Sequence, residues 1–77
     1  MAVTVKFFAN LRERLGRSQE VIMPVGPLTV REVWDAVVED ESLPENILIA
    51  VNMEYARPDA EVGDGDEVAF FPPVTGG

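Results

Sequence analysis

The sequence has 77 residues, with six Lys plus Arg against 14 Asp plus Glu, and it contains neither Cys nor His. The net charge of −8 at pH 7 repels a phosphate backbone, so we expect no nucleic-acid partner. Without Cys and His there is no disulfide framework, thiol nucleophile or Cys/His zinc site, and the most common general base is missing. Hydrophobic residues at 47% and charged residues at 26% predict one small packed domain.

The charges are unevenly distributed along the chain. Residues 1–31 carry five basic and two acidic side chains, whereas residues 32–77 carry one basic and 12 acidic side chains. Such an excess is typical of a solvated acidic face that aids solubility. The alternative is a surface that steers basic protein partners towards the chain. Composition does not separate the two.

The first predicted element is a strand over residues 3–8. Val3, Val5 and Phe7 alternate with their neighbours, which is the period-2 pattern of a half-buried strand. No basic region precedes this stretch and Lys6 interrupts it, so it is neither a signal peptide nor a membrane span. We therefore expect a cytoplasmic protein with no membrane partner.

Two short elements come next in the chain. Asn10 is placed to cap a helical turn over residues 11–15, which is expected to end at Gly16. Residues 20–25 have the composition of a second strand, and a Gly-Pro pair directly after them breaks it.

The main helix is predicted over about residues 30–40. Thr29 and Glu32 have the spacing of a capping box, in which each side chain accepts a hydrogen bond from the backbone N–H of the other. Trp34 lies within an apolar stripe, so it is predicted to pack in the core rather than to form a ligand platform. The stripe follows the spacing of one helical face and consists of Val30, Val33, Trp34, Val37 and Val38.

The rest of the chain is predicted to form strands separated by turns. Residues 47–51 are an apolar run short enough for a strand buried on both faces. Residues 52–57 are expected to form a turn and a short strand, and residues 63–66 have dense turn chemistry. Residues 67–71 form the last predicted strand, which ends at Pro72 because a prolyl nitrogen cannot donate to a ladder.

This order of elements predicts an α+β fold. Four to five strands cannot be covered on both faces by one long helix, so the helix is expected to pack across one face of a mixed sheet. A β-grasp, or ubiquitin-like, architecture satisfies the order, whereas a ferredoxin-like fold would need a second long helix. We expect one domain over residues 1–73 and a flexible C-terminal tail over residues 74–77.

Asp64, Asp66 and Glu67 cluster in the glycine-rich turn and suggest a site for a hard cation. An EF-hand loop, however, needs a bidentate Glu at its twelfth position, and the twelfth position counted from Asp64 is Thr75. The pattern therefore predicts a polar turn and no metal site.

The strongest anomaly is the C-terminal sequence FFPPVTGG, residues 70–77. A frayed terminus is the ordinary explanation of such an ending. Against it, the Pro-Pro pair favours extended polyproline geometry, and residues 72–77 reach about 20 Å when fully extended. Gly76 and Gly77 lack Cβ atoms, so they can pass a narrow channel and leave the terminal carbonyl open to attack. The segment is predicted to be a substrate handle rather than an active site.

The segment from Asp64 to Gly77 closely resembles the C-terminus of the molybdopterin synthase small-subunit family, whose members are ubiquitin-like sulfur carriers. The resemblance extends to residues 50–52, to residues 5–9 and to Leu11-Arg12-Glu13, so it covers nearly the whole chain. Gly-Gly alone would be a weak signal, but the ending FFPPVTGG in so short a chain is specific.

The resemblance implies a chemistry for the C-terminus. An activating enzyme would use ATP and magnesium to join the Gly77 carboxylate to AMP, and a sulfur donor would displace AMP to leave a thiocarboxylate. The large subunit of molybdopterin synthase would accept the tail, and the sulfur would pass to cyclic pyranopterin monophosphate in molybdenum cofactor biosynthesis. The chain would bind no cofactor itself, and it would be the sulfur-donating subunit of a heterotetramer rather than a catalyst alone.

The resemblance also assigns site residues. Gly77 would bear the sulfur, and Gly76 would give the tail clearance. Because neighbouring residues of a strand alternate between faces, only one of the two Phe side chains can face the core, and the sequence leaves open which. Arg12 is a candidate charge contact with a partner, or else a solvated residue on a short helix. The tail and part of the docking surface would be shaped by Phe70, Phe71, Pro72, Pro73, Val74 and Thr75.

Two other kinds of function stay open on the sequence. The same carrier chemistry can serve another pathway, such as thiamine synthesis, cysteine synthesis or tRNA thiolation. Alternatively, the chain is a ubiquitin-like protein modifier that is linked through Gly77 to lysines of target proteins, or a plain interaction module.

Overall fold

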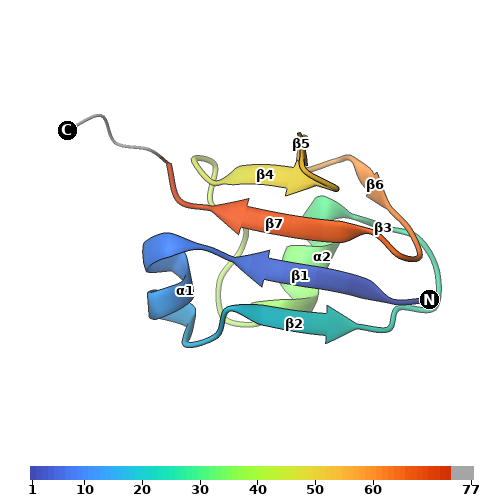
Figure 1. Cartoon of the computed structure of the whole chain (residues 1–77), viewed down its shortest axis with the longest axis horizontal. Coiled ribbons are helices and arrows are strands. Elements are labelled where there is room, and N and C mark those ends of the chain that lie inside the picture. The colour runs from blue at the N-terminus through green and yellow to red at the C-terminus, as the bar shows by residue number, and fades with distance from the viewer. Residues whose placement is uncertain (74–77) are drawn as a thin grey trace.

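The computed structural model describes residues 1–73 and contains one five-stranded sheet, one two-stranded sheet and two α-helices. Figure 1 shows the elements in chain order, coloured from blue to red. Their bounds are β1 (Val3–Phe7), α1 (Ala9–Leu15), β2 (Gln19–Ile22), β3 (Leu28–Thr29), α2 (Val30–Val37), β4 (Leu48–Val51), β5 (Glu54–Tyr55), β6 (Glu61–Val62) and β7 (Glu67–Phe71).

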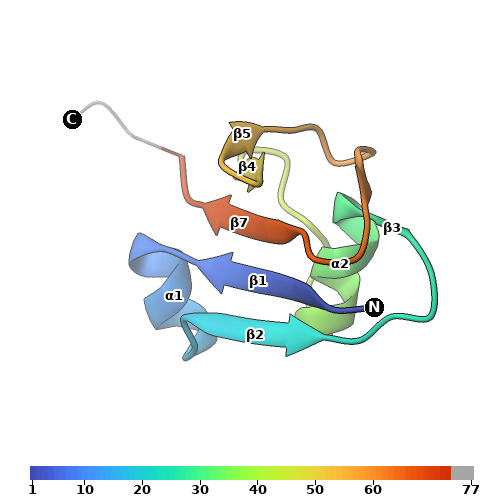
Figure 2. The same cartoon turned by 45° about the vertical axis from the view of Figure 1, so that its right-hand side comes forward.

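The main sheet is mixed, with the strand order β2-β1-β7-β4-β5. The central pair, β1 and β7, is parallel, whereas β2 pairs antiparallel with β1 and β4 pairs antiparallel with both β7 and β5. Helix α2 lies across one face of this sheet, as two views show (Figures 1 and 2). The predicted α+β, β-grasp architecture is confirmed.

The core lies between α2 and the sheet, and Trp34 is its largest side chain. Trp34 is fully buried, and its ring meets Phe70 and Phe7 edge-on at centroid distances of 5.0 and 6.3 Å. Its indole Nε1 donates to the carbonyl of Glu41 at 2.9 Å, which satisfies the one polar atom of the side chain. The predicted core position of Trp34 is confirmed.

The capping box at the start of α2 is also confirmed. Thr29 Oγ1 accepts from the Glu32 N–H at 3.2 Å, and Glu32 Oε1 accepts from the Thr29 N–H at 2.9 Å. The helix ends at Val37, earlier than predicted, because Val38 is extended and buried in the core. The Arg17 guanidinium donates to the Val37 carbonyl and so satisfies one of the last carbonyls of the helix.

Two local predictions need correction, and one pair of strands was missed. Asn10 does not cap α1, because the helix begins at Ala9 and Phe8 occupies the N-cap position without a side-chain hydrogen bond. Strand β2 ends at Ile22, because Pro24 follows closely and has no N–H to donate. The pair β3 and β6 was not predicted, because each strand has only two residues. Within residues 1–73, no helix has the length and apolar character needed to cross a membrane.

Strand β4 differs from its prediction in burial. Ile49 faces the core at 4% exposure, but Leu48 is 38% exposed. The strand is therefore not buried on both faces, because α2 covers only one face of the sheet and leaves the other without a helix (Figure 2).

The acidic turn before β7 is built around Asp66. Its Oδ2 accepts from the Gly63 N–H at 2.8 Å and its Oδ1 accepts from Asn52 Nδ2 at 2.9 Å, while Asn52 Oδ1 accepts from the Glu67 N–H at 2.9 Å. The backbone N–H of Gly63 and then the Asn52 amide hold the pKa of Asp66 below its ordinary value of 3.8, because both donors favour the ionised carboxylate. The described residues contain no group of three acidic side chains suited to a metal ion.

Replacing Thr29 by Ala should lower the free energy of unfolding by about 1 kcal/mol, because one hydrogen bond of the capping box is lost. Thr29→Ser is the matched control, since its hydroxyl can still accept from the Glu32 N–H. Urea denaturation measures both variants. Equal losses in the Ala and Ser variants would contradict the capping role.

Replacing Asp66 by Asn should destabilise the fold by about 1–2 kcal/mol at neutral pH. Because the folded pKa of Asp66 lies below its ordinary 3.8, the stabilisation is present above that value and is lost as the pH falls through the folded pKa. The difference between wild type and variant should therefore narrow in acid, measured by denaturation at several pH values. Asp40→Asn is the control, because it changes an exposed acidic residue and should have little effect on stability. If the difference in free energy of unfolding between wild type and Asp66→Asn stays constant with pH, the stability does not depend on the ionisation of Asp66.

Candidate functional site

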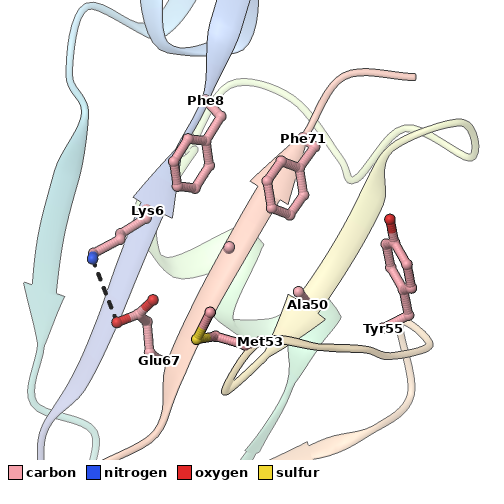
Figure 3. Close-up of a pocket in the computed structure, with 8 residues that line it drawn as sticks. Lys6, Phe8, Ala50, Met53, Tyr55, Glu67 and Phe71 are labelled. Carbon is pink, nitrogen blue, oxygen red and sulfur yellow. Dashed lines mark ion pairs between the residues drawn. The ribbon is translucent and has the colours of Figure 1, made fainter. Parts of the chain in front are cut away.

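The sheet face opposite α2 contains a shallow depression of about 520 Å³. Its floor is formed by Ala50 and Ala69, which are paired in register across β4 and β7. Because these residues are small while their neighbours are large, the centre of the face is hollow and its rim is raised (Figure 3). We call this surface the open face, and it is lined by Lys6, Phe8, Ala50, Met53, Tyr55, Glu67, Ala69 and Phe71.

An aromatic pair forms one end of the open face. The rings of Phe8 and Phe71 are stacked with a centroid distance of 4.8 Å and an interplanar angle of 11°, and Figure 3 shows them side by side. The reason lies in the parallel register of β1 and β7, which pairs Phe7 with Phe70. Since alternate residues of an extended backbone point to opposite faces, Phe8 at the N-cap of α1 and Phe71 in β7 both turn outward, and the two rings meet.

The structure decides which phenylalanine faces outward. Phe70 is fully buried and stacks on Phe7 at 6.0 Å in the core, so a partner on the open face cannot reach its side chain. Phe71 is half-buried at the surface and is the residue available for contact. Of the two phenylalanines in the predicted docking segment, Phe70 is therefore the one that faces the core.

One ion pair crosses the open face. Lys6 Nζ lies 3.5 Å from Glu67 Oε2, and the two side chains are 35% and 40% exposed. These are the only charged residues that line the face within the described chain. In water such a pair contributes little, about 0–1 kcal/mol, but its two charges neutralise each other at one side of an otherwise apolar surface.

The β4–β5 hairpin supplies the other side of the rim. Asn52 and Met53 both have positive φ values, 51° and 70°, as a two-residue hairpin loop of the I′ type requires. Met53 and Tyr55 are 92% and 83% exposed, and the hydrogen bond from Asn52 to Asp66 holds the loop that carries them. The turn at Asp66 thus positions one side of the open face.

The apolar surface continues from the open face to the last described residues. A second groove of about 450 Å³ is lined by residues that include Phe71, Leu48, Pro72 and Pro73, and the two prolines are half-buried. The predicted site residues Val74, Thr75, Gly76 and Gly77 lie outside the described residues. They follow Pro73, the last described residue, directly in the sequence.

Arg12 does not line either of these two surfaces. It is exposed in the last turn of α1. The structure places Phe71, Pro72 and Pro73 on one groove and Arg12 on a separate element, α1, so the role of Arg12 as a partner contact stays a prediction.

Sequence reasoning missed most of the open face. Phe8, Met53 and Tyr55 are exposed large hydrophobic residues, and none was singled out as a contact. One signal was present: the pairs Phe7-Phe8 and Phe70-Phe71 end two strands, and pairing those strands in parallel places one ring of each pair outward. The ion pair from Lys6 to Glu67 had no local signal, because it depends on the strand register.

The chain is similar over nearly its whole length to curated proteins of known function. The molybdopterin synthase sulfur carrier subunit of Haemophilus influenzae is 52% identical over 86 residues, covering 97% of this chain and 99% of that protein. The corresponding subunit of Escherichia coli is 39% identical over 85 residues, with the same coverage.

Solved structures are similar over the whole length. The crystal structure of SAMP1, a small archaeal modifier protein from Haloferax volcanii, matches with a TM-score of 0.85 at 31% identity and covers 100% of both chains. The complex of subunits 1 and 2 of molybdopterin-converting factor from Helicobacter pylori matches with a TM-score of 0.66 at 27% identity, again over 100% of both chains. The ThiS family itself matches residues 5–77, so the chain belongs to the ThiS family.

Proposed function

We propose that this chain is the sulfur-carrier subunit of molybdopterin synthase. In this role the Gly77 carboxylate is adenylated and then converted to a thiocarboxylate, whose sulfur passes to cyclic pyranopterin monophosphate in molybdenum cofactor biosynthesis. The proposal is supported by family membership and by full-length relatives that carry this name.

One observation carries the proposal in the structure: the exposed aromatic stack adjoins the start of the C-terminal segment. Phe71 stacks on Phe8, and Pro72 and Pro73 follow at once along the same groove. A partner that covers the aromatic stack is therefore placed to receive the residues after Pro73. Exposed aromatic side chains beside a preformed groove are typical centres of binding energy in protein interfaces.

The partners follow from the same proposal. The large subunit of molybdopterin synthase is the proposed acceptor of the tail, as the complex of subunits 1 and 2 from Helicobacter pylori supports. A heterotetramer, an activating enzyme that uses ATP and magnesium, a separate sulfur donor and a cytoplasmic location are further parts of the proposal. The chain supplies the reactive carboxylate, and the partner proteins supply the catalytic groups.

A second candidate function is protein modification. The similarity to SAMP1, a protein named as a modifier, favours it. Both functions use an activated Gly77 carboxylate, and they differ in the nucleophile that attacks it: a sulfur donor in one case and a lysine amine of a target protein in the other.

The carrier chemistry can be tested on the intact chain. Incubation with ATP, the activating enzyme and a sulfur donor should replace one terminal oxygen by sulfur, seen as a gain in intact mass. Appending one residue after Gly77 should abolish sulfur delivery to the pyranopterin precursor, because the reacting carboxylate is displaced. An unchanged mass would rule out the carrier role, and higher-mass conjugates joined through Gly77 would favour the modifier.

Replacing Phe71 by Ala should weaken binding to the large subunit by about 2 kcal/mol, or roughly 30-fold, if the stack is an interface hot spot. Titration calorimetry with the purified large subunit measures the loss. Val25→Ala is the matched control, because Val25 is a fully exposed apolar residue that does not line the open face. Equal binding by the two variants would show that the stack is not part of the interface.

A further inference from the structure

The sequence contains a single lysine, Lys6, and its other five basic residues are arginines. An arginine guanidinium stays protonated and delocalised at physiological pH, so it does not act as an amine nucleophile. Lys6 is therefore the only side-chain amine of these 77 residues that can be acylated. Any effect of side-chain amine acylation on this sequence must therefore arise at Lys6.

Lys6 lies on β1, at the side of the open face opposite Tyr55 (Figure 3). Figure 3 shows its side chain pointing towards Glu67 and away from the aromatic stack, with Nζ 3.5 Å from Glu67 Oε2. Its side chain is 35% exposed, and the depression beside it has a volume of about 520 Å³. A small reagent can therefore reach Nζ in the isolated chain.

We propose that Lys6 is an acylation site for a small activated acyl donor, such as an acyl phosphate, and that acylation closes the open face to its partner. The proposal rests on the docking role given to this face above. The deprotonated amine attacks the acyl carbon, a C–N bond forms, the C–O bond to phosphate breaks, and phosphate leaves with the electron pair. The proton lost from the nitrogen goes to solvent, and the product is a neutral amide.

The effect on docking follows from the charges. Lys6 is the only cation that lines the face in the described chain, and Glu67 is the only anion. Acylation removes the positive charge, so Glu67 is left as an unpaired carboxylate within an apolar surface. A partner that covers the face must then desolvate that carboxylate without compensation, which is far costlier than covering a neutral pair.

The chain offers matched variants for a test. Wild type and Lys6→Arg are treated with acetyl phosphate, the added acetyl group is located by peptide mass mapping, and binding to the purified large subunit is measured. Acetylation at Lys6 should weaken wild-type binding at least about tenfold, since a charge left buried and unpaired in an interface costs more than that. Lys6→Arg keeps the charge and the N-terminal amine, so treatment should leave its binding unchanged.

A double variant isolates the physical cause. Lys6→Gln should bind as weakly as the acetylated chain, and Lys6→Gln with Glu67→Gln should recover most of the binding, because no charge is then left unpaired. Thermal unfolding confirms that each variant is folded. Three results would each overturn the proposal. The first is unchanged binding after Lys6 is acetylated. The others are an equal loss of binding in treated Lys6→Arg and a double variant that binds as weakly as Lys6→Gln. Failure of the untreated wild type to bind would instead overturn the docking role itself.

Discussion

The parallel pairing of β1 with β7 is the constraint on which both faces of the sheet depend. Its register places Phe7 beside Phe70, and these two rings form the core together with Trp34. The same register places Phe8 beside Phe71 on the opposite face. Because the side-chain period of a strand is two, a slip of one residue would exchange core and surface rings. One ladder of paired residues therefore sets both the aromatic core and the exposed aromatic stack.

The fold leaves one face of its main sheet uncovered because it has too few helices to cover both faces. Helix α2 packs on one face and α1 is short, so the opposite face stays accessible (Figures 1 and 2). Small residues at its centre and large ones at its edge make that face concave. The net charge of −8 is consistent with a protein that binds other proteins, and the open face itself carries a balanced pair of charges.

What the sequence predicted correctly was encoded locally. The capping box at Thr29, the apolar stripe around Trp34 and the strand that ends at Pro72 each depend on neighbouring residues, and each was confirmed. The errors were of two kinds. The first was local: Asn10 is not the cap, because Ala9 already belongs to the helix. The second was not local: the exposure of Leu48 and the formation of the open face depend on which strands pair, and no short stretch of sequence specifies that pairing. The four residues that follow Pro73 were assigned from family resemblance and lie outside the described structure.

The central position of β7 also has a consequence for how the chain folds. Strands β2 and β1 form one half of the sheet and β4 and β5 the other, and only β7 joins the halves. Yet β7 is the last element of the described chain, so it leaves the ribosome after all the others. The sheet cannot close during synthesis until that strand is free. Closure of the sheet must therefore wait until the chain has been synthesised past Phe71, and the long-range β1–β7 contacts add a loop-closure entropy to this step.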